Sequence, residues 1–440
     1  MPDDDNRVDA VAAQIRLDDA RGQFQRRERE LLAELEAARA RIAALEGSTF
    51  WRFTAPLRAV AHRVKHLLHA PTVPPGAPAA PIALPRTLAA HGATRHRVLL
   101  IDAEPLTPDQ DAGSLRATRL IEVMRAMGCE VAFACEQERS ALDELLAVRG
   151  GELDIVILSR HAVAARHLEE VRRRAPRALV VFDTVDLHFV RERRRAELDP
   201  AAFLGEGAEA IYREEVACVR ASDVTWAVSE REREIVLREV PEARVMVLAT
   251  IHVPVAPVKP FAARAGLLLV GGFRHTPNVD AALHFARAIA PRLRRRLPGV
   301  ATYIVGSGAP AALASLAVEG LEVVGQVPDM APWLERCRVS VSPLRYGAGI
   351  KGKVGEALAH GLPVVATSVS VEGMGLADGS EVLVADDPDA FAAAVERLYA
   401  DEALWARLSR AGIEHVARHF SPEAAAHALA PLLELAAARR

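Results

Sequence analysis

The stretch SPLRYGAGIKGKVGEALAHGLPVVATS at residues 342–368 decides the fold class. It predicts a strand that ends at Ser342, a glycine-rich loop, a helix over residues 353–360 and a second strand from Pro363. Gly361 suits the left-handed position that ends a helix. A strand, a glycine loop and a helix in this order are typical of a parallel α/β sheet that holds a ligand at its edge.

The loop and the first turn of this helix carry groups that suit a sugar nucleotide. Glycine lets the backbone approach a ligand closely, and a helix N-terminus offers free N–H groups to an anion. Two of the chain's four lysines, Lys351 and Lys353, fall where a diphosphate would lie. Glu356, one turn into the helix, can accept hydrogen bonds from the vicinal hydroxyls of ribose. The alternative interpretation is a glycine-rich turn with two solvated lysines. The candidate nucleotide-binding residues of this segment are Gly349, Ile350, Lys351, Gly352, Lys353 and Glu356.

Six short apolar runs rich in β-branched residues precede a proline-rich hinge at residues 251–261, and six more follow it. Helix-length periodic stretches separate the runs, which is typical of parallel sheets covered on both faces. The sequence therefore predicts an α/β protein with two Rossmann-like doubly wound domains that face a cleft. The predicted strands are residues 97–102, 130–134, 153–159, 178–183, 223–229, 244–249, 267–272, 301–306, 321–325, 338–344, 363–368 and 381–385.

The N-terminal part of the chain departs from this pattern. Residues 1–47 form a charged helical extension with a short heptad-like seam, which fits either a short coiled coil that self-associates or a helix that docks on a partner. Residues 51–70 predict a basic amphipathic helix, suited to an anionic membrane surface or to packing on the protein's own body. The expected domains are the extension at 1–47, the basic segment with a proline-rich linker at 48–95, the Rossmann-like domains at 96–255 and 256–420, and a C-terminal helix at 421–440.

Composition excludes several classes of protein. Hydrophobic residues make up 50% of the chain, charged residues 26%, and the formal net charge is −3, which argues against a nucleic-acid binder. The four cysteines lack CxxC spacing, so neither a disulfide framework nor a zinc site is expected. The acidic N-terminus is unlike a signal peptide, and no apolar run is long enough to cross a bilayer. We expect a cytoplasmic protein that contacts a membrane only peripherally.

The segment at 342–368 resembles the nucleotide-binding region of glycosyltransferase family 4, retaining enzymes of the GT-B fold, and in particular relatives with a GAGIKGK loop. LLLVGGFRHTPNVDAALHF at 267–285 and YIVGSGAP at 303–310 resemble the turns that face the donor phosphates. VVGQVPDMAPWL at 323–334 resembles the turn that holds the nucleobase. The likeness spans about residues 265–420. It adds these donor contacts to those in the loop: Gly272, Arg274, Gly306 and Val327.

The resemblance implies sugar transfer from a nucleotide-sugar to a glycan or lipid-linked acceptor, as in cell-surface polysaccharide synthesis. Members of the family commonly carry two glutamates eight positions apart; Glu356 matches the second, but Ala348 stands at the first. The usual arginine–lysine pair is replaced by Arg274 and His275, so Lys351 is expected to neutralise the leaving phosphate. The fold works without a bound metal, and the nucleotide-sugar is a substrate, so no cofactor is expected.

The domain at 96–255 is then expected to bind the acceptor. The family implies a histidine that contacts the transferred sugar or the acceptor, and His188 is our candidate; the alternative is a loop histidine paired with Asp186 for structure alone. Asp109 and Asp111 form a DxD pattern that we interpret as a helix cap and not as a metal site. The remaining acceptor or cleft candidates are Gly113, Ser114, Arg116 and Asp186.

Other functions remain open at this point. GSGAPA at residues 306–311 satisfies the dinucleotide pattern GxGxxA, but it follows the second strand of its domain and contains a proline. A sugar-nucleotide epimerase of the same fold would need no acceptor. A non-catalytic GT-B scaffold in polysaccharide assembly would fit the missing glutamate at Ala348.

Overall fold

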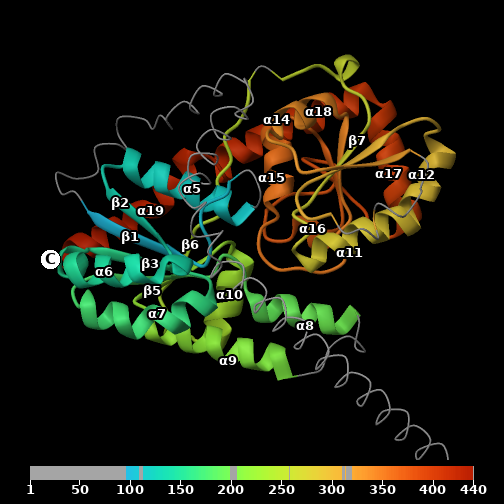
Figure 1. Cartoon of the computed structure of the whole chain (residues 1–440). Coiled ribbons are helices and arrows are strands. Elements are labelled where there is room, and N and C mark those ends of the chain that lie inside the picture. Colours follow the sequence, from blue (N-terminus) through green and yellow to red (C-terminus); the bar gives the residue numbers. More distant parts are fainter. Residues whose placement is uncertain are drawn as a thin grey trace, which may run out of the picture. The chain divides into compact units, whose positions relative to one another are not determined.

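The computed structural model describes residues 96–108, 112–198, 206–256, 258–309, 313 and 320–439 (Figure 1). The predicted extension at 1–47, the basic segment at 48–95 and the DxD pattern lie outside the described residues. Among the helices that the structure describes, none is both long and apolar enough to span a bilayer.

The N-terminal half is built on a parallel sheet of six strands in the order β2-β1-β3-β4-β5-β6. The order reverses beside β1, so the carboxyl ends of β1 and β3 form the edge where a doubly wound sheet binds ligands. All six predicted strands are confirmed, and only their ends differ. The strands are β1 (Arg97–Asp102), β2 (Glu130–Cys135), β3 (Ile155–Ser159), β4 (Leu179–Asp183), β5 (Val224–Ala227) and β6 (Val245–Val247).

Helices cover both faces of this sheet because the strands are apolar on both sides. One face packs on Leu120 and Met124 of α5, and the other on Leu168 of α7 and Val219 of α9. Ser229 caps α10 by accepting a hydrogen bond from the N–H of Glu232. The helices are α5 (Ala112–Ala126), α6 (Arg139–Arg149), α7 (His161–Arg174), α8 (His188–Leu198), α9 (Glu206–Ala221) and α10 (Glu230–Glu239).

The C-terminal half is also built on a parallel sheet of six strands, in the order β12-β11-β10-β7-β8-β9. Its order reverses between β7 and β10, which places the turn after β7 next to the glycine loop after β10. The strands are β7 (Leu267–Val270), β8 (Thr302–Val305), β9 (Leu321–Gly325), β10 (Val339–Ser342), β11 (Val364–Ala366) and β12 (Leu383–Val384). The helices are α11 (Thr276–His284), α12 (Ala290–Arg296), α14 (Ala331–Arg336), α15 (Gly352–Ala359), α16 (Ser368–Val371), α17 (Pro388–Ala400) and α18 (Glu402–His419).

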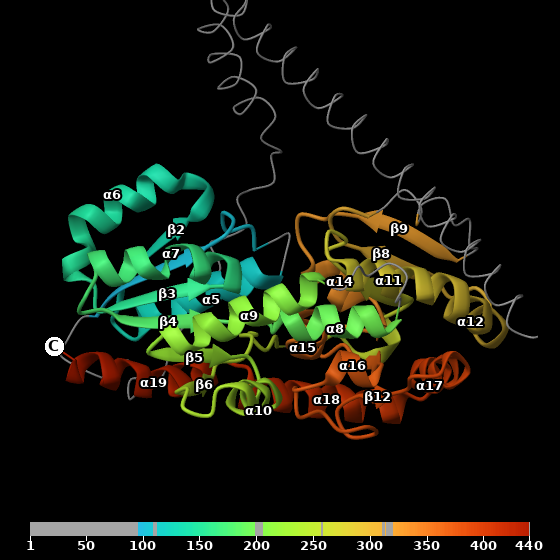
Figure 2. The same cartoon turned by 90° about the horizontal axis from the view of Figure 1, so that it is seen from below.

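The last helix, α19 (Pro422–Ala438), returns to the N-terminal half (Figure 2). Leu429, Leu432 and Leu433 lie in the same core as α5. The helix forms where the sequence predicts it, but it belongs to the core of the first domain. The chain passes back between the two halves just before α19. The hinge contacts this segment, where the N–H of His252 donates to the carbonyl of Phe420 at 2.7 Å.

Candidate active site

Glycines shape the carboxyl edge of the C-terminal sheet. Gly306 has φ +145°, and a Cβ there would lie 1.8 Å from the carbonyl oxygen of Gly271. The turns after β7 and β8 are also joined by a hydrogen bond from the N–H of Phe273 to the carbonyl of Ser307 at 2.8 Å. Backbone therefore meets backbone here, which leaves peptide groups at the edge where a diphosphate is expected.

Two lysines lie at the start of α15. The Nζ of Lys351 donates to the carbonyls of Ala348 at 2.9 Å and Gly349 at 2.5 Å. The Nζ of Lys353 donates to Asn278 Oδ1 at 2.6 Å. Within the described part of the chain, neither ammonium forms an ion pair with a carboxylate.

Burial affects the charge of both lysines. It lowers the pKa of Lys351 to about 8, although Glu232 and other nearby carboxylates oppose the shift. It lowers the pKa of Lys353 to about 7, and the charge of Lys351 adds to the effect. An anion that enters would favour the protonated form of both groups.

Asn278 connects the two sides of the strand-order reversal. Its Nδ2 donates to the carbonyl of Gly272 at 2.9 Å while its Oδ1 accepts from Lys353. The predicted donor residues Gly272 and Lys353, 81 positions apart in the sequence, are thus brought together. The sequence signal of Asn278 was only its place in the first turn of α11.

The other predicted donor residues lie on the turns around the contact between Asn278 and Lys353. Arg274 is exposed, next to Gly308, where a Cβ would lie 3.4 Å from Arg274 Cγ. The N–H of Gly306 donates to the carbonyl of Gly325, two residues before the half-buried Val327. Ile350 is half-buried against the core under α15.

The start of α5 meets the start of α15. A Cβ on Gly352 would lie 3.2 Å from Cβ of Ala112, so the predicted cleft residues Gly113 and Ser114 are adjacent to the glycine loop. Gly113 is half-buried and Ser114 is buried. Two helix N-termini, one from each half, therefore lie close together and both favour negative charge.

Glu356, the predicted ribose ligand, is bound by the other half of the molecule. Arg119 donates to both carboxylate oxygens at 2.9 and 3.0 Å, and Nδ1 of His252 lies 2.7 Å from Oε2. Burial alone would raise the pKa of Glu356, but these hydrogen bonds and the Arg119 charge lower it well below its usual range. Gly355 makes room for His252, since a Cβ there would lie 2.4 Å from Nε2.

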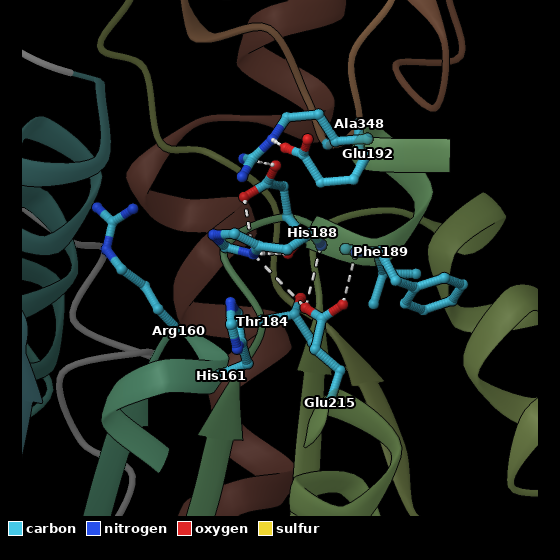
Figure 3. Close-up of polar contacts among 12 residues, drawn as sticks. Arg160, His161, Thr184, His188, Phe189, Glu192, Glu215 and Ala348 are labelled. Atoms are coloured by element: carbon cyan, nitrogen blue, oxygen red, sulfur yellow. Dashed lines mark hydrogen bonds and ion pairs between the residues drawn. The ribbon is translucent and has the colours of Figure 1, made fainter. Parts of the chain in front are cut away.

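His188 and Asp186 lie at the carboxyl edge of the N-terminal sheet. Nδ1 of His188 is 3.0 Å from the carbonyl of Asp186, and its ring is edge-on to His161 with centroids 4.6 Å apart. Glu215 accepts from the N–H groups of His188 and Phe189 and so caps α8 (Figure 3). Burial would lower the pKa of His188, but the Asp186 and Glu215 carboxylates raise it.

Asp186 also adjoins the glycine loop. A Cβ on Gly349 would lie 2.8 Å from Asp186 Cβ. Arg191 donates to Asp186 Oδ2 at 2.7 Å. Burial would raise the pKa of Asp186, but the charges of His188 and Arg191 lower it.

The remaining charges at this edge neutralise one another. Arg116, a predicted cleft residue, is buried and donates to both oxygens of Asp183 at 2.6 and 3.1 Å. Arg160 donates to Asp102 Oδ1 at 2.9 Å. Arg160 has φ +75°, in the left-handed region that ordinary residues avoid. Such strain is concentrated at functional sites in many proteins.

Several residues that join the two halves were not anticipated from the sequence. Arg194 donates to both oxygens of Glu372 and to the carbonyl of Gly347 at 2.6 Å. Glu232 accepts from the N–H of Gly349 at 2.9 Å. A signal existed only for Glu232, which stands three residues after the capping Ser229.

Two further features bear on function. In the described part of the chain, no three His, Cys, Asp or Glu side chains are grouped to hold a metal ion. A pocket of about 540 Å³ lies at the opposite edge of the N-terminal sheet, lined among others by Asp223, Arg244 and Arg439. The Asp223 carboxylate in this pocket is already bound by Arg172 at 2.6 Å and by Arg439 at 2.9 Å.

Comparison with known proteins places this geometry in context. Residues 264–401 match the family model described as glycosyl transferases group 1. The solved structure of sucrose-phosphate synthase from Thermosynechococcus elongatus is similar, with a TM-score of 0.61 and 17% identity over 79% of this chain and 100% of that one. HepE from Anabaena, solved with UDP and glucose, is similar with a TM-score of 0.53 and 12% identity over 78% of this chain and 100% of that one. No curated protein matches the sequence. The two parallel sheets are arranged as in these GT-B structures, which confirms the predicted fold class.

Proposed function

We propose that the chain is a nucleotide-sugar-dependent glycosyltransferase whose donor diphosphate binds between the turn after β7 and the start of α15. One observation carries the proposal: Lys351 and Lys353 lie at a helix N-terminus beside glycine turns, and their hydrogen bonds to described residues all go to uncharged groups. The family match over residues 264–401 covers this same half and supports it.

The reaction we propose is retaining transfer. The bond between the sugar C1 and the phosphate oxygen breaks, and the acceptor hydroxyl oxygen forms a new bond to C1 on the same face. The acceptor proton passes to the leaving phosphate, so no separate protein base is required. Lys351, Lys353 and the N–H groups of Gly352 and its neighbours stabilise the negative charge that develops on the leaving group.

The N-terminal half would supply the acceptor side. His188 and Asp186 are our candidates to contact the transferred sugar or the acceptor hydroxyl, since Asp186 adjoins Gly349 of the donor loop. Gly113 and Ser114 would line the same cleft next to Gly352. The acceptor we propose is a glycan or a lipid-linked glycan of cell-surface polysaccharide synthesis, reached at the inner face of a membrane, with residues 51–70 as the contact.

The donor screen starts with UDP because structural neighbours were solved with UDP and with UDP-glucose. The full-length protein is titrated calorimetrically with UDP, GDP, dTDP, ADP and CMP. Lys353→Met removes one ammonium at the site, and Lys259→Met is the matched control on the exposed hinge, where Lys259 pairs with Glu335. We expect one nucleotide to bind, with affinity about tenfold weaker in Lys353→Met and unchanged in Lys259→Met.

Failure of every nucleotide to bind, or equal binding by Lys353→Met and the wild type, would contradict the proposal. A second assay separates the enzymes of this fold. Conversion of a nucleotide-sugar into another nucleotide-sugar without acceptor would indicate an epimerase. Binding without any turnover in the presence of lipid-linked acceptors would indicate a scaffold.

A further inference from the structure

We propose that Glu232 is a positioning residue that holds the glycine loop, and through it Lys351, in the arrangement that receives the donor phosphate. The proposal concerns the conformation of the loop, and its link to phosphate rests on the proposed function. Glu232 belongs to the N-terminal half of the molecule, and the proposed reaction gives it no role.

Glu232 is anchored and hidden from solvent. It is the third residue of α10, its own N–H donates to Oγ of Ser229 at 3.2 Å, and the residue is 5% exposed. A short anchored helix turn gives the side chain little freedom, so its carboxyl group lies at a fixed place against the other half.

One carboxyl oxygen joins two loops that are far apart in sequence. Oε1 accepts from the N–H of Leu187, which precedes α8, at 3.2 Å. The same oxygen accepts from the N–H of Gly349 at 2.9 Å. The loop that carries Asp186 and the loop that carries Lys351 are therefore held by a single acceptor.

The bond to Gly349 determines where the Lys351 ammonium lies. Gly349 has φ +68° and approaches Asp186 so closely that a Cβ would lie 2.8 Å from the aspartate Cβ. Its N–H is bound by Glu232 and its carbonyl accepts from Nζ of Lys351 at 2.5 Å. Fixing this peptide group therefore fixes both the ammonium and the N–H groups that follow it.

The geometry assigns a positioning role and not a catalytic one. Oε2 of Glu232 is buried, so it is not accessible to a substrate, and it has no hydrogen-bond partner among the described residues. Burial, together with the nearby Asp186 charge, raises the pKa of Glu232 to about 7, while Lys351 and the two backbone N–H groups oppose the shift. Both bonds to Oε1 come from N–H donors, so they need an acceptor but not a negative charge.

The experiment therefore compares variants that keep the hydrogen-bond acceptor at position 232 with variants that remove it. Glu232→Gln keeps a carbonyl acceptor of the same shape, whereas Glu232→Met keeps the length and removes the acceptor. Glu230→Ala is the matched control on the same helix, where the side chain is 70% exposed. Hydrogen–deuterium exchange of the peptide that spans residues 345–355 is measured in the full-length protein without ligand, followed by titration with UDP.

Glu232→Met should exchange this peptide about tenfold faster than the wild type and weaken UDP binding about tenfold, the effect of one lost hydrogen bond near a charge. Glu232→Gln and Glu230→Ala should stay within about twofold of the wild type in both measurements. Should Glu232→Met fail to fold, Glu232→Ala takes its place in the same comparison.

Unchanged exchange in the acceptor-free variant would overturn the proposal. So would equal loss in Glu232→Gln and Glu232→Met, because the carboxylate itself would then be required. If the wild type binds no UDP, the proposed function fails, but the exchange of the 345–355 peptide still decides the role of Glu232.

Discussion

The carboxyl edges of the two sheets both include a reversal of strand order but carry opposite chemistry. At the N-terminal edge each aspartate that the structure describes is already bound to an arginine, and the charges cancel within the protein. These pairs are Asp102–Arg160, Asp183–Arg116 and Asp186–Arg191. The C-terminal edge is rich in glycine. Among the described residues, the lysines at positions 351 and 353 donate to backbone or amide oxygens and pair with no carboxylate.

This difference supports the proposal that the C-terminal edge binds the donor and the N-terminal edge the acceptor. An anion needs cations whose charge is not already cancelled, together with free N–H groups, and only the C-terminal edge of the described chain offers both. An edge of paired carboxylates and histidine suits neutral hydroxyl groups, which hydrogen-bond to charged groups without demanding net charge. The two halves are therefore expected to differ in how they respond to the same kind of substitution.

The largest effect is expected at a glycine of the C-terminal edge. Gly306→Ala should lower the free energy of unfolding by about 3 to 4 kcal/mol, because both the positive φ and the Gly271 carbonyl oppose a Cβ. Gly128 of the N-terminal half also has positive φ but has no atom within 4 Å of such a Cβ, so Gly128→Ala should cost about 1 kcal/mol. Urea denaturation measures the free energy of unfolding of both variants. Equal losses would contradict the close approach of the Gly306 turn to Gly271.

The next effect compares the cations of the two edges. Lys351→Ala should weaken UDP binding about 100-fold, since it removes a poorly solvated charge beside the phosphates. Arg160→Ala, at the N-terminal edge, should change UDP affinity less than about threefold because Arg160 is bound to Asp102. Calorimetric titration of both variants measures the loss of UDP affinity, with circular dichroism as the control for folding. A larger loss in Arg160→Ala than in Lys351→Ala would contradict the assignment of the donor to the C-terminal edge.

The pH dependence of binding sharpens the contrast further. The pKa values of Lys353, about 7, and Lys351, about 8, mean that the free protein loses these charges as the pH rises. UDP affinity should therefore fall about tenfold between about pH 6.5 and 8.5, with proton uptake on binding. Titrations in buffers of different ionisation enthalpy measure that uptake, and flat affinity across this range would contradict charged lysines in the site.

The smallest effect concerns the contact that links the two edges. Arg119 occupies both oxygens of Glu356, whereas His252 contacts only Oε2. Arg119→Met should therefore free Oε1 for ribose and tighten UDP binding about threefold. Arg125→Met, on the same helix, is the control because the Arg125 side chain donates to the carbonyl of Val131, away from Glu356. Weaker binding in Arg119→Met would show that the ion pair organises the site and does not compete with the nucleotide.

The elements with local signals were predictable from the sequence. The starts of α17 and α18 carry such signals, because Asp387 and Asp401 each cap a helix start. The glycine loop was also predictable from a local signal, since its glycines, lysines and helix start lie within a dozen residues of one another. The last strand is shorter than predicted, because only Leu383–Val384 pair with β11.

What could not be predicted depends on pairing across long separations. Arg119 and Glu356 are 237 positions apart, and Arg194 and Glu372 are 178 apart. Nothing in either local sequence shows that these charges meet, because each would be equally stable in water as a solvated side chain. The same limit explains why the docking of α19 on the first domain was not anticipated.

The most direct test of this account is a crystal structure of the full-length protein saturated with UDP. The account predicts a diphosphate between the turn of Gly272 and the start of α15, within hydrogen-bond distance of Lys351 or Lys353. A nucleotide bound instead at the edge of the N-terminal sheet near Asp102 and Arg160, or in the pocket beside Asp223, would contradict it.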